Sequence, residues 1–228
     1  MNFIEKIGGI MYKKILKDEN NSNYIKQYSP YNKYKNKDIN NDLISFYYQF
    51  NYLKNIYRQG WLKGLLESRN ATEIESIADH SWSVAMLAIS LIEKYKLNYD
   101  ITKCMKLSII HELGEIYAGD ITPDDNISKG KKHELEKDAI EKLMSSVKFE
   151  NDFIDLWDEF ESQETEESIF VKQVDKLEFI LQASCYGLDT SYLKSSMNGI
   201  TLPYLREIVE ELKVITENNE VPFCLTNK

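Results

Sequence analysis

The stretch between residues 111 and 120 combines one histidine with three carboxylates in otherwise apolar surroundings. His111, Glu112, Glu115 and Asp120 lie there among Ile, Leu, Ala, Tyr and Gly residues. Burying such polar groups is unfavourable unless they are paired, and a metal ion is an effective partner. On a helix, His111 and Glu115 share a face, and Glu112 lies about 100° away, within reach of the same ion. The stretch therefore predicts a metal site.

Two more polar residues interrupt apolar helical patterns elsewhere in the chain. His80 lies on the apolar stripe of one predicted helix, and Asp175 lies beside the stripe of another. A lone histidine in such a place is most often a hydrogen-bonded core residue. His111 occupies the matching inward position of the next helix, however, which favours metal ligation by both. Imidazole together with carboxylates suits zinc, manganese, cobalt or iron rather than calcium.

The elements that must position these residues are predicted to be helices. From Asp42 onward, apolar residues recur at helical spacing in about seven segments, and no alternating run requires a significant sheet. Thr72 or Ser76 is expected to cap the helix that carries His80. Residues 101–117 predict one continuous, buried helix. Gly119 is expected to end it and to turn Asp120 back toward the site.

The chain divides into three parts by composition. Residues 1–41 are rich in Asn, Lys and Tyr and predict a loosely ordered N-terminal extension with a short helix near residues 4–16. Residues 42–217 form the predicted all-α domain, and residues 218–228 a C-terminal tail. Residues 150–167 are acidic without Lys or Arg, which is typical of a solvated helix face.

Composition limits the classes of function. A net charge of −9 over 228 residues disfavours binding to nucleic acid polymers, while a small anionic substrate stays compatible because a metal reverses the sign locally. No apolar run reaches the roughly 18 residues of a membrane span. Three cysteines without metal-type spacing favour a reducing, cytoplasmic location over a disulfide framework.

The order of His80, then His111-Glu112, then Asp175 resembles the ligand pattern of the HD-domain metal-dependent phosphohydrolases. Within that family the chain is most similar to the HD-domain 5′-deoxynucleotidases. Four ordered stretches carry the resemblance: residues 58–61, 75–80, 111–121 and 170–183. The family fold is an all-helical bundle, which agrees with the periodicity.

The resemblance implies an activity and a role for each site residue. The implied reaction is hydrolysis of deoxyribonucleoside 5′-monophosphates to deoxynucleoside and phosphate, with a small nucleotide as the substrate. His80, His111, Glu112 and Asp175 would hold one divalent ion of the Mn, Co or Zn class. Glu115 would act as general base or orient the attacking water, and Asp120 would lie near the sugar and leaving group. Three residues would bind the substrate: Arg58 at the phosphate, Trp61 at the sugar, and Asp120.

One departure from the family pattern bears on activity. The family's Asp after the second histidine is Glu112 here. Glutamate ligates the same metals, but its extra methylene moves the carboxylate. Weaker metal binding, another metal or loss of activity therefore stay open. Two alternative functions follow: an HD phosphohydrolase acting on a cyclic or polyphosphorylated nucleotide, and a nucleotide-binding protein with a weakened site.

The remaining candidates receive simpler interpretations. Lys131 and Lys132 are compatible with phosphate binding but are better explained as a solvated helix start. His133 is expected at the surface, and as the only extra histidine it disfavours a diiron oxygenase. A homodimer is implied by the resemblance alone. The aromatic residues between positions 46 and 57 are compatible either with a dimer face or with a core.

Overall fold

The computed structural model describes residues 15–17, 24–26, 39–62, 74–145, 147, 152–188 and 193–217. Within these ranges the chain is all-helical apart from one short hairpin, so the predicted fold class is confirmed. The hairpin pairs β1 (Ile15–Lys17) antiparallel with β2 (Tyr24–Lys26). The α-helices in the described residues are α2 (Asp42–Phe50), α4 (Ile77–Tyr95), α5 (Ile101–Ile110), α6 (Glu115–Ala118), α7 (Lys129–Met144), α8 (Asp152–Ser162), α9 (Glu166–Cys185), α10 (Lys194–Asn198) and α11 (Pro203–Glu217). Two 3-10 helices, η2 (Asn51–Asn55) and η3 (Pro123–Asp125), also lie in the described residues, and residues 59–62 are helical as well.

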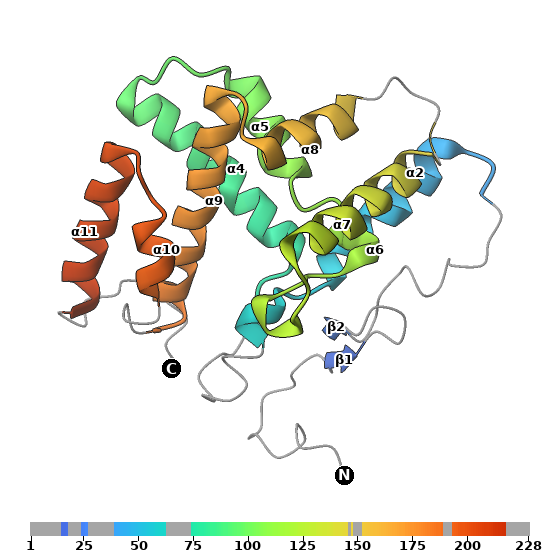
Figure 1. The fold of residues 1–228 in the computed structure, drawn as a ribbon, viewed down its shortest axis with the longest axis horizontal. Coiled ribbons are helices and arrows are strands. Elements are labelled where there is room, and N and C mark those ends of the chain that lie inside the picture. The colour runs from blue at the N-terminus through green and yellow to red at the C-terminus, as the bar shows by residue number, and fades with distance from the viewer. Residues whose placement is uncertain are drawn as a thin grey trace, which may run out of the picture.

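Helices α4 and α9 lie in the middle of the molecule, and α5 packs against both (Figure 1). Their inward faces are apolar at helical spacing, and Val84, Leu107, Val174 and Leu177 are completely buried. On the other side of α9, helices α10 and α11 cover it. The buried apolar side chains of these helices form a first core cluster. This cluster fixes the relative positions of α4, which carries His80, α9, which carries Asp175, and α5, which ends just before His111.

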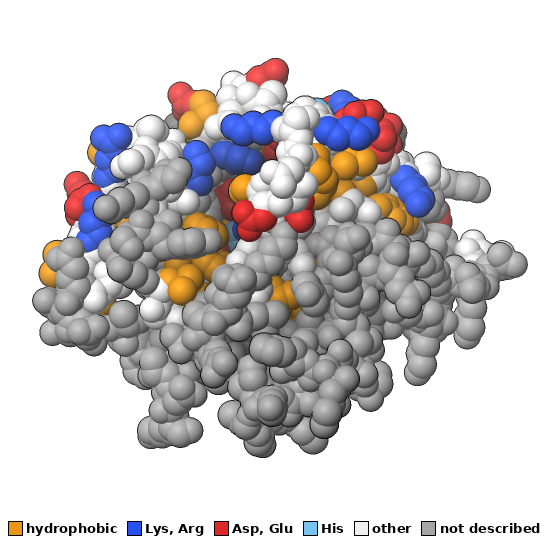
Figure 2. All heavy atoms as spheres, turned by 60° about the horizontal axis from the view of Figure 1, so that its bottom comes forward, with side chains coloured by type: hydrophobic (Ala, Val, Ile, Leu, Met, Phe, Trp, Pro, Cys, Tyr) orange, Lys and Arg blue, Asp and Glu red, His pale blue; other side chains and the backbone are white. Residues whose placement is uncertain are grey.

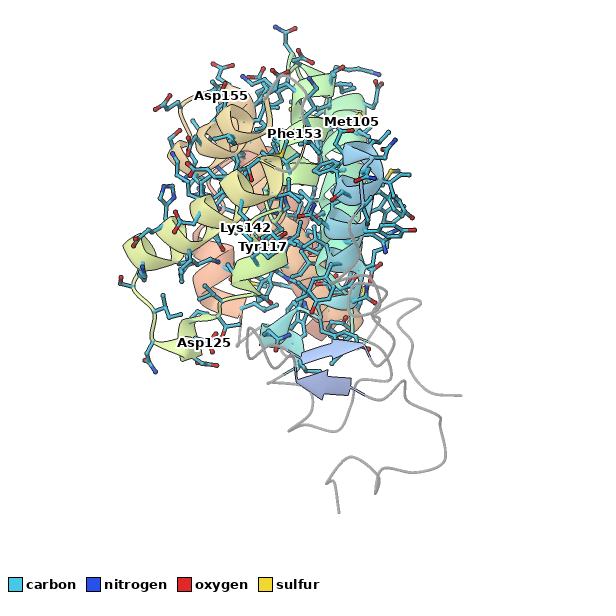
Figure 3. The ribbon with its side chains drawn as sticks, turned by 90° about the vertical axis from the view of Figure 1, so that its right-hand side faces the viewer. Met105, Tyr117, Asp125, Lys142, Phe153 and Asp155 are labelled. Carbon is cyan, nitrogen blue, oxygen red and sulfur yellow. The ribbon has the colours of Figure 1, made fainter. Side chains whose placement is uncertain are left out.

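A second core cluster joins η2, α6, α7 and α8. It includes Tyr52 and Trp157, both almost fully buried. Lys142 of α7 lies over the ring of Tyr117 of α6, with Nζ 4.1 Å from the ring centroid (Figure 3). Ile77 belongs to this second cluster and Val84 to the first. Because His80 lies between them on α4, the candidate ligand sits where the two clusters meet.

The aromatic stretch between positions 46 and 57 belongs to the core in its second half. Tyr52, Leu53, Ile56 and Tyr57 are buried, whereas Leu43, Ile44 and Tyr47 of α2 are exposed. A core therefore explains the second half of this stretch.

The helix that carries His80 begins where a capping residue is expected. Ser76 accepts a hydrogen bond from the backbone N–H of Asp79 at 3.2 Å, and Asp79 accepts one from the N–H of Ser76 at 2.8 Å. This capping box satisfies two N–H groups that a helix start leaves unpaired. The other capping candidate, Thr72, lies outside the described residues.

The predicted continuous helix over residues 101–117 is wrong. Helix α5 ends at Ile110, a turn follows over residues 111–114, and α6 begins at Glu115. The turn is tightened by i to i−3 hydrogen bonds from Leu113 to Ile110 and from Glu115 to Glu112. Burial is also incomplete, because Ile109 is 53% exposed.

Other expectations fall largely outside the described residues. Ile15 and Leu16 lie in β1 rather than in the predicted helix over residues 4–16, whose remaining positions are not described. The tail over residues 218–228 is likewise not described. Among the described helices, none has the length and apolar character required to cross a membrane.

Candidate metal centre

Three elements bring the four predicted ligands together. His80 comes from α4, His111 and Glu112 from the turn after α5, and Asp175 from α9. His80 Nε2 lies 3.1 Å from Asp175 Oδ1 and 3.8 Å from Glu112 Oε1, and His111 Nε2 lies 3.6 Å from the same glutamate oxygen. The donor atoms of His80, His111 and Glu112 lie within 4.8 Å of one another. A single ion fits among donors at these separations.

The turn that carries His111 and Glu112 depends on a close backbone contact. A Cβ atom at Gly114 would lie 2.8 Å from the backbone oxygen of Glu136 on α7. Only glycine therefore lets α7 pack this closely against the turn. The contact fixes both candidate ligands relative to α7.

Hydrogen bonds at Nδ1 orient both histidines, while Nε2 of His80 lies within hydrogen-bond distance of Asp175 Oδ1, at 3.1 Å. His111 donates from Nδ1 to the backbone oxygen of Ser108 at 2.8 Å, and its buried Nε2 has no hydrogen-bond partner among the described residues. His80 Nδ1 lies 2.6 Å from Glu178 Oε2. Metal-bound histidines commonly donate their second N–H to a carbonyl or a carboxylate in this way. The unpartnered nitrogen of His111 and the two-imidazole, two-carboxylate donor set fit a transition-metal ion.

The protonation of the ligands also suits a cation. Burial lowers the pKa of His111, which keeps the imidazole neutral. Burial and Arg58 act to lower the pKa of His80, but hydrogen bonds to Asp175 and Glu178 outweigh them and raise it to about 10. Burial opposes ionisation of Glu112 and Asp175, yet the histidines near both, and Arg58 near Glu112, hold their pKa values well below the usual range. Both carboxylates are therefore ionised, and His80 must lose a proton to ligate a metal.

Glu178 and Glu75 are site residues that the sequence analysis missed. Glu178 is 3% exposed and orients His80 through Nδ1. Burial and the nearby Glu178 raise the pKa of Glu75 to about 7. The available signal was the position of Glu178, three residues after Asp175 and therefore on the same helix face.

Arg58 lies at the centre rather than on a free helix end. Its Nη1 donates to Glu112 Oε1 at 2.8 Å, and its side chain is only 16% exposed. Burial opposes its charge, but Asp120, Glu112, Glu115 and Asp175 together raise the pKa of Arg58 above its usual value. The next residue, Gln59, donates its backbone N–H to Asp120 Oδ2 at 2.5 Å. The segment that follows η2 is thus tied to both Glu112 and Asp120.

Trp61 is buried, with 3% of its surface exposed. Its ring stacks on Phe179 with centroids 4.4 Å apart, and its Nε1 donates to Glu75 Oε1 at 2.7 Å. These contacts account for Trp61 as a core residue beside the centre. Its predicted position against the sugar stays a prediction.

Glu115 is the most isolated carboxylate of the centre. It is 1% exposed, and neither oxygen has a hydrogen-bond partner among the described residues. Burial raises the pKa of Glu115 well above its usual range, and Glu112 and Asp120 raise it further. Asp120 is also buried. It directly follows Gly119, which has a φ of 76° and ends α6 as predicted. The buried acid Glu115 is suited to proton transfer once positive charge approaches it.

The two neighbouring lysines of α7 differ. Lys131 is exposed and pairs with Glu134 at 2.9 Å, as expected for a solvated helix start. Lys132 instead directs its Nζ to Glu136 Oε1 and to the backbone oxygen of Ile121, both at 3.4 Å. His133 is 45% exposed and stacks on Trp157, with ring centroids 5.0 Å apart. On the face of the molecule that Figure 2 shows, the basic and acidic side chains of the described residues are interspersed with apolar ones.

Comparison with known proteins identifies the family to which the chain belongs. The sequence profile of the HD domain matches residues 50–213. The 5′-deoxynucleotidase HDDC2 of Mus musculus is 33% identical over 186 residues, covering 78% of this chain and 88% of the mouse protein. The protein of the same name from Xenopus laevis is 39% identical over 146 residues, covering 63% of this chain and 69% of its own.

Solved structures share the fold. A conserved hypothetical protein from Pyrococcus furiosus superposes with a TM-score of 0.61 at 31% identity, covering 75% of this chain and 98% of its own. A protein from Magnetospirillum magnetotacticum described as a predicted metal-dependent phosphohydrolase has a TM-score of 0.61 at 23% identity, covering 79% of this chain and 96% of its own. The chain belongs to the HD-domain phosphohydrolases and is related to the 5′-deoxynucleotidase HDDC2 proteins.

Proposed function

We propose that the protein is a metal-dependent 5′-nucleotidase that hydrolyses deoxyribonucleoside 5′-monophosphates to deoxynucleoside and phosphate. One observation carries the proposal: His80, His111, Glu112 and Asp175 converge beside a partly buried arginine and a buried glutamate that has no hydrogen-bond partner among the described residues. The names of the related deoxynucleotidases support the choice of substrate.

In this proposal the four ligands hold one divalent ion of the Mn, Co or Zn class. A bound ion of this kind polarises a phosphoryl oxygen and lowers the pKa of water. Glu178 keeps the ring of His80 oriented through the 2.6 Å contact at Nδ1. The backbone carbonyl of Ser108 does the same for His111.

The reaction needs a proton acceptor and a place for the leaving group. Glu115 accepts a proton from the attacking water as the water oxygen bonds to phosphorus, and the 5′ oxygen leaves phosphorus and takes up a proton from solvent to give the deoxynucleoside hydroxyl. Arg58 and Lys132 lower the pKa of Glu115, opposing the effect of burial. Asp120, held by the backbone of Gln59, faces the sugar side. Arg58 neutralises charge on the phosphate.

Phosphate release from a panel of nucleotides tests the proposal. Protein stripped of metal and reloaded with Mn²⁺, Co²⁺ or Zn²⁺ is expected to release phosphate from deoxynucleoside monophosphates faster than from ribonucleotides. Preference for cyclic or polyphosphorylated nucleotides would point instead to another HD phosphohydrolase. A rise in Tm with nucleotide but no turnover with any metal would indicate a binding protein, for which the occupied Arg58–Glu112 pair is the supporting feature.

A further inference from the structure

Lys132 places a positive charge at the edge of the candidate centre. It lies near the start of α7, and its Nζ is 3.4 Å from the backbone oxygen of Ile121, the residue after Asp120. The same Nζ lies 3.4 Å from Glu136 Oε1, one helical turn further along α7. Its side chain is 38% exposed, so the ammonium group is anchored on the protein side and open on the other.

The packing of α7 explains why Lys132 faces the centre. Gly114, two residues after Glu112, has its Cα against the backbone of Glu136. Residues four apart on a helix share a face, so Lys132 extends from the same side of α7 as Glu136. The side chain therefore runs beside the segment that carries the candidate ligands and Asp120.

Lys132 and Arg58 act on the same carboxylates from two different elements. Burial would lower the pKa of Lys132, but Glu112, Glu115, Glu136 and Asp120 outweigh it and raise the pKa. Glu112, Glu115 and Asp120 also raise the pKa of Arg58. Two cations that share these three neighbours flank one region of space.

A phosphate monoester needs more than one cation at this place. Near neutral pH it carries close to two negative charges, and the centre presents the carboxylates of Glu112, Asp120 and Asp175 to it. Arg58 already gives Nη1 to Glu112 at 2.8 Å. An ammonium group has three donors, and both contacts of Lys132 are long, so it retains a donor for a phosphate oxygen.

We propose that Lys132 is a second phosphate-binding residue, which contacts a phosphate oxygen of the nucleotide together with Arg58. This proposal rests on the proposed nucleotidase function. It assigns to α7 a direct part in substrate binding. A purely structural role, in which Lys132 only neutralises Glu136, predicts a different set of results.

The test compares Lys132→Met, Lys132→Arg and the neighbouring Lys131→Met in metal-loaded, full-length protein. Loss of one charge-assisted hydrogen bond is expected to raise KM for a deoxynucleoside monophosphate, and the inhibition constant of inorganic phosphate, about tenfold or more in Lys132→Met. Lys132→Arg is expected to recover most of that loss because it keeps the charge. Lys131→Met should stay within about twofold of the natural protein, because its exposed ion pair contributes little.

Calorimetric titration with inorganic phosphate separates this proposal from the proposed function. If the natural protein turns over nucleotides while Lys132→Met keeps its KM and phosphate affinity and only loses Tm, Lys132 is structural and the inference is wrong. If no nucleotide is turned over but phosphate binds at least tenfold more weakly to Lys132→Met, the inference stands and the nucleotidase proposal fails. If the metal-loaded natural protein neither turns over nucleotides nor binds phosphate, both fail.

Discussion

Arg58 donates from Nη1 to Oε1 of Glu112 at 2.8 Å, and that same oxygen lies 3.6 Å from His111 Nε2. One oxygen atom of Glu112 therefore lies next to both Arg58, the candidate phosphate-binding residue, and His111, another candidate metal ligand. Glutamate occupies the position where the family has aspartate, and its length allows this contact. The pair joins the metal centre to the substrate side of the site.

Shortening Glu112 to aspartate tests this connection. Glu112→Asp is expected to retain metal but to lose the hydrogen bond to Arg58, which frees the guanidinium for phosphate. KM for a deoxynucleoside monophosphate should then fall, by up to about tenfold for one charge-assisted hydrogen bond. Steady-state kinetics give KM, and competition with a chelator gives metal affinity. An unchanged KM together with retained metal would show that Arg58 does not bind the phosphate.

Glu178 is expected to set metal affinity without touching the metal. Glu178→Gln keeps an oxygen that accepts from His80 but removes the charge, so metal affinity should fall about 10- to 100-fold. Chelator competition measures the affinity, and the visible spectrum of the cobalt form reports the ligand geometry. Glu166→Gln, on the exposed first turn of the same helix, is the control. Equal metal affinities in the two variants would exclude the orienting role.

Gly114 and Gly130 make a matched pair of substitutions. Gly114→Ala places a Cβ 2.8 Å from a backbone oxygen, so it should lower the free energy of unfolding by about 1–3 kcal/mol and weaken metal binding. Gly130→Ala, in α7, meets nothing within 4 Å and should raise stability by about 0.4–1 kcal/mol. Denaturant unfolding measures both. Equal effects from the two would show that the turn tolerates a side chain.

The pKa of His80 predicts how stability of the metal-free protein depends on pH. Its pKa is raised from 6.5 to about 10 in the folded protein, so the folded protein binds this proton more tightly than the unfolded chain does. That stabilisation is complete below pH 6.5 and is lost as pH rises through about 10. Tm of the metal-free protein should therefore fall between pH 7 and pH 10. The metal-loaded protein, with a neutral His80, should lose less Tm over this range, and parallel losses in both forms would contradict the assignment.

The sequence predicted most of the centre because its polar residues interrupt apolar helical stripes. His80, His111 and Asp175 were identifiable in this way. Glu178 was missed, since its place three residues after Asp175 does not set it apart from the other carboxylates, in a chain with 37 Asp and Glu residues, until its burial is known. The turn over residues 111–114 was hidden by a continuous apolar run, and the need for Gly114 arises from α7, which is distant in sequence. The directions of Lys131 and Lys132 depend on tertiary packing alone.

The most direct measurement is a titration of metal-free protein with Co²⁺, in which bound metal and phosphate release from a deoxynucleoside monophosphate are followed together. Both are expected to rise in proportion and to level off at one metal ion per chain. His111→Ala, which removes the unpartnered Nε2, should abolish both. Full phosphate release without bound metal, or an unaltered titration in His111→Ala, would contradict the proposed metal centre.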